Sequence, residues 1–250
     1  MKQSGKDNRI YMIISIAIWL IIWFLAANYI DNEVFLPSPA SVLTSLGTLA
    51  VTPQFYLTIL KTLGGIALGF LIGFVSGLLL AWLSSLAALL YEIISVPVRL
   101  IKSIPVASIV ILLLVWLESK HLSTVISAMM VLPLIYQATI GSINETTAKM
   151  GNNLRIYSLK YNRRLFYVYL PELKSPLLSA CTVAVGFAFK SGIAAEIIGL
   201  IRGSIGNELY LSKLYLDIPT LFAWTVVIII VCFAFEKLIL LILKLAFRHK

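Results

Sequence analysis

The sequence is poor in charge, histidine and cysteine, and each shortage excludes a class of protein. Only 12% of its 250 residues are charged, against about 25% in a typical soluble domain. The two histidines, His121 and His249, form no metal-ligand cluster, and there is no glycine-rich phosphate loop. The two cysteines, Cys181 and Cys232, lie in apolar stretches, where we interpret them as small core residues. No nucleophile lies beside a base within an apolar stretch, so we expect neither an enzyme nor a metal-binding protein.

Long uncharged runs are what the sequence has in abundance. Its residues are 60% hydrophobic, and residues 10–30, 62–91 and 121–144 contain no Lys, Arg, Asp or Glu. A helix needs about 18 to 20 apolar residues to cross a membrane. The sequence therefore predicts an all-α, polytopic membrane protein with a single transmembrane domain over residues 1–250. We expect six transmembrane helices, over residues 10–30, 64–83, 93–117, 122–142, 176–200 and 218–243.

The third of these spans, residues 93–117, is the least regular. Pro97, Arg99, Lys102 and Pro105 interrupt it. Broken helices are tolerated in membranes where neighbouring protein or water satisfies the freed backbone groups. We expect Arg99 and Lys102 either to lie near the cytoplasmic end of the span or to line a wet cavity.

The net charge of +9 reflects where basic residues gather along the chain and is not taken as a sign of nucleic-acid binding. Basic residues near span ends mark the cytoplasmic side of a membrane protein. They precede the first span, follow the last one and crowd the polar segment 144–174, which carries Lys149, Arg155, Lys160, Arg163, Arg164 and Lys174. We therefore expect both termini and this segment to lie in the cytoplasm.

The chain after the first span predicts a short amphipathic helix on the outer membrane surface. Within Leu36-Pro37-Ser38-Pro39, Ser38 is suited to be an N-cap and Pro39 to be an early helical residue. Apolar residues then follow on one face, at Val42, Leu43, Leu46, Leu49 and Ala50.

The second span contains a regular series of glycines: Gly65, Gly69, Gly73 and Gly77. A four-residue step keeps them on one helical face, and small residues on one face let a second helix approach closely. We interpret this face as a helix-packing surface, within one chain or between two.

The polar segment 144–174 also has helical periodicity. Its apolar and aromatic residues recur at three- and four-residue steps, at Leu154, Tyr157, Tyr161, Leu165 and Val168. An exposed stripe of this kind needs a partner, which is either this protein itself, a groove on another protein or the lipid surface. Membrane lipid remains an alternative because basic clusters beside a membrane attract anionic headgroups.

The fifth span carries two ionisable residues, Lys190 and Glu196, with Ser191 and Gly192 between them. Ionisable residues inside a span are costly and usually face a protein interior or a wet path. The two are six residues apart, so they do not pair along one helix face. We expect them either to line a translocation path or gate, or to pair with other helices.

Taken together, these features resemble the inner-membrane permease subunits of binding-protein-dependent ABC importers, in the branch that handles nitrate, sulfonate, taurine, bicarbonate and some vitamin precursors. The resemblance covers about residues 30–245. It rests on Leu36-Pro37-Ser38-Pro39, the six-span pattern, Leu170-Pro171 at the close of the polar segment, and residues 190–199.

The resemblance implies an ABC-importer permease (type I) fold in the bacterial cytoplasmic (inner) membrane, working by ATP-driven alternating access. It implies no cofactor in this chain, because ATP and Mg would be bound by partner ATPase subunits. Further implied partners are an extracytoplasmic solute-binding protein and a second permease copy, either identical or a paralogue. Selection of the solute would fall mainly to the binding protein.

In this family the polar segment carries a Glu-Ala-Ala motif, a glycine six residues after the glutamate, and a Leu-Pro about a dozen residues later. Its helix inserts into the ATPase. Glu145-Thr146-Thr147 with Gly151 keeps the first spacing but lies too far from Pro171. Counting back from Pro171 instead places the motif at Asn152-Asn153-Leu154, with Ser158 in place of the glycine, and we favour this alignment. The ATPase-coupling residues that the resemblance implies are then Asn152, Asn153, Leu154, Tyr157, Ser158, Tyr161, Leu165, Leu170 and Pro171.

A stand-alone secondary transporter or channel, driven by an ion gradient through Lys190 and Glu196, is the alternative function. Inverted repeats would favour it, and we find none between the two halves of the chain.

Overall fold

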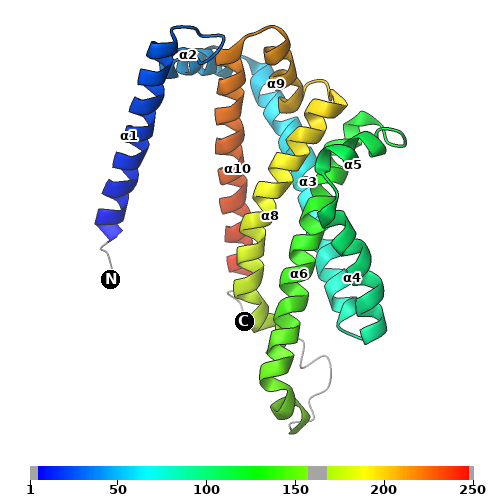
Figure 1. Cartoon of the computed structure of the whole chain (residues 1–250). Helices are drawn as coiled ribbons and strands as arrows, with labels where there is room; N and C mark the ends of the chain where they lie inside the picture. Colours follow the sequence, from blue (N-terminus) through cyan, green and yellow to red (C-terminus); the bar gives the residue numbers. More distant parts are fainter. Residues whose placement is uncertain (1–4, 157–167, 248–250) are drawn as a thin grey trace.

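All the long elements of the computed structural model are α-helices. It describes the backbone of residues 5–156 and 168–247, and the side chains of residues 10–149 and 168–247. In chain order the helices are α1 (Gly5–Ile30), α2 (Pro39–Ala50), α3 (Pro53–Ser84), α4 (Ala88–Ser103), α5 (Val106–Leu113), α6 (Ser119–Ile156), α8 (Leu170–Gly199), α9 (Ile205–Leu214) and α10 (Ile218–Ala246) (Figure 1). The prediction of an all-α protein is confirmed.

Five of these helices are long and apolar enough to cross a membrane, namely α1 from Ile10, α3, α6 as far as Lys149, α8 and α10. The bent pair α4–α5 makes a sixth candidate when it counts as one span. The predicted polytopic membrane protein is therefore confirmed. The helices α3, α6 and α8 are longer than the predicted spans 64–83, 122–142 and 176–200, because helical hydrogen bonding continues into the polar residues beyond each apolar run.

The third predicted span, residues 93–117, is not one continuous helix. It is divided between α4 and α5, which are bent by 102° at the break. Pro105 explains the break, because proline has no backbone N–H and disfavours the α conformation in the residue before it. Ile104 is accordingly extended, with φ −85° and ψ 131°, whereas Pro97 is accommodated inside α4. Helix α5 also ends at Leu113, before the predicted end of the span.

The predicted cap of α2 is confirmed. The Ser38 side chain accepts a hydrogen bond from the backbone N–H of Ser41 at 3.1 Å, and Pro39 lies in the first turn. Leu46 and Leu49, on the inner face of α2, pack against an aromatic cluster contributed by α3 and α10. Helix α2 lies across the end of the bundle (Figure 1).

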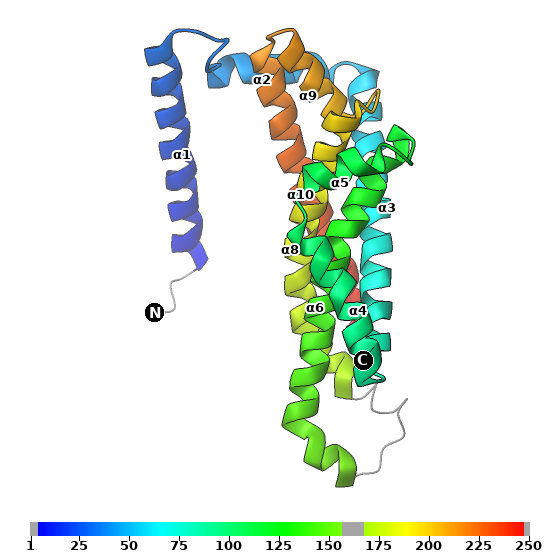
Figure 2. The ribbon, with the colours of Figure 1, turned by 45° about the vertical axis from the view of Figure 1, so that its right-hand side comes forward.

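The hydrophobic core lies where α3, α6 and α8 meet, and α6 packs along both of the others. Buried side chains from the three helices interlock there, among them Phe70, Val131, Ile135, Val185 and Phe189. Figure 2 shows α6 as the long helix that continues beyond the rest of the bundle.

The glycine series of α3 faces α6. A Cβ added at Gly69, Gly73 or Gly77 would come within 3.0 Å of a backbone carbonyl oxygen of α6, at 2.6 Å for Gly73 and 2.8 Å for Gly77. Gly65 is less crowded, because the nearest atoms to a Cβ added there would be two side-chain oxygens at 3.6 Å. The absent side chains bring the two helix backbones into direct contact along three successive turns.

Helix α1 stands apart from the other helices (Figures 1 and 2). Its Trp23 donates a hydrogen bond to the carbonyl of Pro37 at 3.0 Å and stacks on Phe222 of α10, with ring centroids 5.9 Å apart. The start of α1, the end of α6, the start of α8 and the end of α10 lie toward one end of the molecule, which we call the loop end. Helices α2 and α9 lie at the opposite end, which we call the cap end.

Candidate functional site

The four residues that the sequence singles out on α8 do not gather at one place. Ser191, Gly192 and Glu196 are buried in the bundle, whereas Lys190 is exposed. The Ser191 hydroxyl donates to a carbonyl one turn earlier in its own helix, at 2.7 Å. Gly192 is a close-packing position, because an added Cβ would lie 2.6 Å from the hydroxyl oxygen of Ser127. Only Lys190 is thus free to contact a solute or a second subunit.

Glu196 forms a buried polar centre near the cap end. Its side chain is 2% exposed, and its carboxylate accepts hydrogen bonds from the Thr62 hydroxyl at 2.9 Å and the Gly206 backbone N–H at 3.0 Å. The same Thr62 oxygen accepts from the backbone N–H of Ile205 at 2.9 Å. We call Thr62, Glu196, Ile205 and Gly206 the Glu196 joint, since they tie α3, α8 and α9 together. Burying an unpartnered carboxyl group would be strongly unfavourable, so these donors explain how α8 holds it.

The Glu196 joint also completes the N-terminus of α9. The first N–H groups of a helix have no partner inside the helix and carry a partial positive charge. The first two of α9 bond to the joint, and the third, Asn207, bonds to the N-cap hydroxyl of Ser204 at 3.2 Å. A Cβ at Gly206 would collide with that of Glu196. A glycine is therefore what lets the start of α9 approach α8 so closely.

Sequence reasoning identified Glu196 but not its partners. Thr62 is separated from it by 134 residues, and a threonine in an apolar helix gives no local sign of a distant bond. Gly206 could have been found only from its place two residues after Ser204, a suitable N-cap at the start of a short helix.

Two acidic groups outside the spanning helices have shifted titration. Partial burial raises the pKa of Glu208 in α9 above its ordinary value. A hydrogen bond from Lys120 lowers the pKa of Glu118 in the turn before α6, and the two atoms of this ion pair are 2.6 Å apart. Nearby, the Lys61 ammonium donates to the carbonyl of Arg202 in the turn between α8 and α9. Within residues 5–156 and 168–247, no group of His, Cys, Asp and Glu side chains converges to hold a metal ion.

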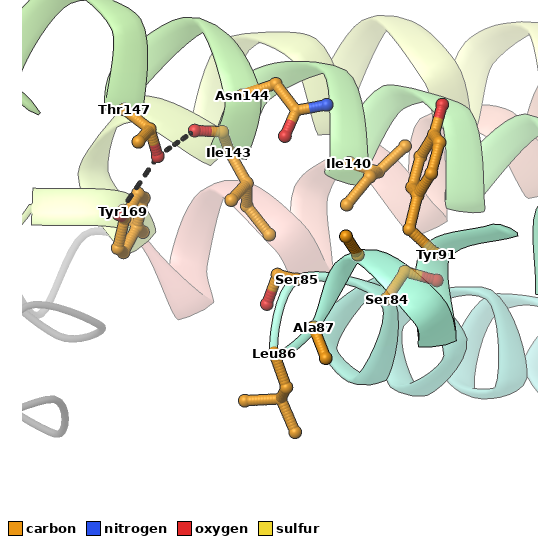
Figure 3. Close-up of a pocket in the computed structure, with 11 residues that line it drawn as sticks. Ser84, Ser85, Leu86, Ala87, Tyr91, Ile140, Ile143, Asn144, Thr147 and Tyr169 are labelled. Atoms are coloured by element: carbon orange, nitrogen blue, oxygen red, sulfur yellow. Dashed lines mark hydrogen bonds between the residues drawn. The ribbon is translucent and has the colours of Figure 1, made fainter.

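At the loop end, a hydrogen bond joins the first part of the polar segment 144–174, in α6, to its last part, at the start of α8. The hydroxyl oxygens of Thr147 in α6 and Tyr169, just before α8, are 3.0 Å apart. Thr147 uses its only hydroxyl proton in a 2.7 Å bond to the carbonyl of Ile143. Tyr169 must therefore be the donor in the bond between them. Figure 3 shows the two bonds that link Tyr169, Thr147 and Ile143.

A cavity of about 550 Å³ lies beside this bond (Figure 3). The turn between α3 and α4 forms one wall, and α6 with Tyr169 forms the other; the lining includes Ser85, Tyr91, Ile143, Asn144 and Thr147. Packing at the loop end is therefore looser than along the glycine face of α3.

The predicted coupling residues are only partly within the described chain. Asn152, Asn153 and Leu154 belong to the last turns of α6, so this part of the polar segment continues a spanning helix. Tyr157, Ser158, Tyr161 and Leu165 lie outside the described residues. Leu170 and Pro171 form the first turn of α8, where a proline is well tolerated because its missing N–H would have no helical partner.

A further polar group lies near the break between α4 and α5. The Lys102 ammonium donates to the side-chain oxygen of Gln137 in α6 at 2.7 Å, and both side chains are exposed. Lys102 lies on the surface and helps to line a cavity of about 210 Å³. Arg99 lies three residues earlier in α4 and bonds to Glu92 and Ser95.

Comparison with known proteins places this geometry in context. Residues 65–249 match the family described as "Binding-protein-dependent transport system inner membrane component". The putative aliphatic sulfonates transport permease protein SsuC of Bacillus subtilis is 21% identical over 217 residues, which cover 86% of this chain and 77% of that protein. A probable ABC transporter permease protein of Haemophilus influenzae is 24% identical, covering 86% of this chain and 87% of its own. One of Brucella melitensis is 25% identical, covering 91% and 92%.

Proposed function

Because this chain belongs to the family of inner membrane components of binding-protein-dependent transport systems, we propose that it carries a small solute into the cytoplasm by ATP-driven alternating access. As a family member it is the non-catalytic, multi-pass permease subunit of an ABC transporter in the inner membrane. ATP is bound by a partner ATPase, and a solute-binding protein is the second partner. The family match is the observation that carries this proposal.

The loop end faces the cytoplasm in this proposal, with both termini. The basic residues of segment 144–174 support that orientation, and so does the length of α6. Its 38 residues extend about 57 Å, well beyond the ~30 Å hydrocarbon layer. The excess would carry Asn152, Asn153 and Leu154 into the cytoplasm, toward an ATPase. Tyr157, Ser158, Tyr161 and Leu165 follow in sequence and complete the proposed docking helix.

The contacts of α6 support its role as the lever of this motion. Displacement of the docking helix would act on α6 directly and on α8 through the bond between Tyr169 and Thr147. The cavity at the loop end leaves room for both to move against the α3–α4 turn. The tight glycine face and the Glu196 joint would then carry the motion to α3 and α9 as rigid contacts.

A second copy of the chain, or a paralogue, would supply the other wall of the pathway, and Lys190 is our candidate for a residue facing it. The likeness to a sulfonate permease supports the branch that handles sulfonate, nitrate, taurine, bicarbonate or vitamin precursors. Selection within that range would rest mainly on the binding protein.

The test is to tag the chain at its C-terminus, extract it gently from its native membrane and identify what co-purifies by mass spectrometry. We expect an ABC ATPase in near-equal amount. A matched variant, Tyr161→Asp, should remain in the membrane but retain less of the ATPase, whereas Tyr161→Phe should retain as much as the wild-type chain. A wild-type chain that purifies alone, under conditions that preserve known complexes, would favour the gradient-driven transporter instead.

A further inference from the structure

In the proposed orientation, the break between α4 and α5 lies at membrane depth. Lys102 is 14 residues after Ala88, the first residue of α4, so it lies about 21 Å along the helix from the loop end. The hydrocarbon layer is about 30 Å thick. The helix stops one residue after Lys102, and the chain turns by 102° into α5.

The backbone at this break is exposed. Ser103, Ile104 and Pro105 all lie on the surface of the chain, and the last carbonyl groups of a helix have no partner inside it. Irregular backbone at this depth is stable only where protein covers it or water fills a cavity beside it. Lipid tails are therefore not what covers this surface.

Lys102 and Gln137 bring polar groups to the break, where the cavity is otherwise lined by apolar side chains. Lys102 uses one of its three donors for Gln137 and keeps two, and within the described chain no carboxylate lies within 4.0 Å of it. Phe187 of α8 lines the same cavity as Lys102. Lys190 is exposed one turn further along that face of α8, also with no ion pair among the described residues.

Other membrane-depth surfaces of the chain have a different character. The outer face of α3 exposes Leu68, Leu71, Ile72, Val75 and Leu79, and that of α10 exposes aliphatic and aromatic residues such as Ile229, Ile230 and Phe233. These faces suit lipid. The face formed by α4, α6 and α8 also exposes apolar residues such as Leu100, Ile104 and Phe187. It differs in adding two ammonium groups and an amide, which lipid tails would not accommodate without a large cost.

We propose that the α4–α5 break is a solute-contacting site for an anionic group, in which Lys102 and Lys190 supply the positive charge and Gln137 holds Lys102 in place. The ligand class is a small oxyanion, such as a carboxylate or a sulfonate, whose oxygens accept from the free ammonium donors. This inference rests on the proposed function, since it assigns the surface to the translocation pathway. Within the solute range proposed above, it selects the anionic members over neutral vitamin precursors.

The test measures the local charge at the break and does not require the solute to be identified. Cys181 and Cys232 are replaced by alanine, and one cysteine is introduced at Ser103, beside Lys102. Membrane vesicles containing the assembled transporter are treated with anionic sulfonatoethyl methanethiosulfonate or with cationic trimethylammonioethyl methanethiosulfonate. Thr48→Cys, on the exposed face of α2, is the reference position that corrects for the intrinsic reactivity of each reagent.

We expect the anionic reagent to be favoured at Ser103→Cys, relative to Thr48→Cys, by roughly tenfold or more, since two unit charges nearby act on each probe in opposite directions. Lys102→Gln should remove most of this preference, and Lys190→Gln part of it. Lys102→Arg should preserve it, which separates loss of charge from damage to the fold.

Two results would overturn the proposal. One is that neither reagent reacts at Ser103→Cys while both react at Thr48→Cys, because the break would then be dry. The other is that Ser103→Cys and Thr48→Cys show the same preference between the two reagents, and that Lys102→Gln does not change it. Co-purification of the ATPase with each variant distinguishes these failures from failure of the proposed function, in which the ATPase is absent whatever the reagent preference.

Discussion

Replacing Gly73 by alanine should destabilise the chain, although alanine is the better helix former. The added Cβ would lie 2.6 Å from the carbonyl oxygen of Ala128, whereas a carbon–oxygen contact settles at about 3.3–3.6 Å. The backbones of α3 and α6 must therefore separate by about 0.7 Å at this point. Overpacking of this kind costs about 1–3 kcal/mol.

Gly64 provides the matched control, nine residues earlier in the same helix. A Cβ added at Gly64 meets nothing within 4 Å, so Gly64→Ala gains the helix propensity of about 1 kcal/mol without a clash. Both variants make the same chemical change, so the propensity gain cancels between them. We expect Gly73→Ala to be less stable than Gly64→Ala by about 1–3 kcal/mol.

The assay is reversible unfolding of the purified chain in mixed micelles by titration with a denaturing detergent, followed by tryptophan fluorescence. The double variant Gly69→Ala/Gly73→Ala extends it. A single separation of the two helices relieves both clashes, so the second substitution should cost less than the first. Equal stability of Gly73→Ala and Gly64→Ala would refute direct backbone contact between α3 and α6, and with it the rigid connection on which the proposed lever depends.

Three further predictions concern the two ends of the bundle and the segment between α6 and α8. Glu196→Ala leaves two buried donors without an acceptor and should destabilise the chain by about 1–3 kcal/mol for each donor, with faster hydrogen exchange at the start of α9. Glu196→Gln keeps an acceptor for Gly206 and should lose about 1 kcal/mol of stability. Equal destabilisation by the two variants would contradict the hydrogen bonds of the Glu196 joint. Tyr169→Phe and Thr147→Val should show a coupling energy of about 0.5–1.5 kcal/mol in a double-mutant cycle of unfolding, while Thr147→Ser should behave as wild type; a coupling of zero would count against the bond. Tyr161→Asp should leave ATP hydrolysis running without transport in proteoliposomes, and unchanged solute-stimulated transport would exclude this face from docking.

Local chemistry was enough to predict some elements in detail. The first span was predicted at residues 10–30, where the structure has it, because an uncharged run of that length leaves the chain no other stable environment. The cap of α2 at Ser38 was also predictable from local chemistry. A serine side chain can accept from an N–H group of the first turn, and the proline that follows it is suited to the first helical position.

The broken third span shows where such reasoning stops. Pro97 and Pro105 are both prolines in an apolar stretch, yet α4 continues through Pro97 and ends before Pro105. A proline removes the same hydrogen bond at either position, and whether a helix continues depends on what neighbouring helices offer the freed groups. The sequence shows both prolines, but it does not predict which of them ends the helix.

The sequence by itself determined the class of the molecule, its first span and the packing face of α3, because burial in a membrane and close approach of helices depend on composition and on a four-residue period. Only the tertiary structure decided what the polar residues within the spans do. It separated Glu196, enclosed by Thr62 and the start of α9, from Lys190, which remains exposed. It also placed Lys102 of α4 beside Gln137 of α6. The partners of a buried polar group come from helices far apart in the chain, and their meeting is fixed by how the whole bundle packs.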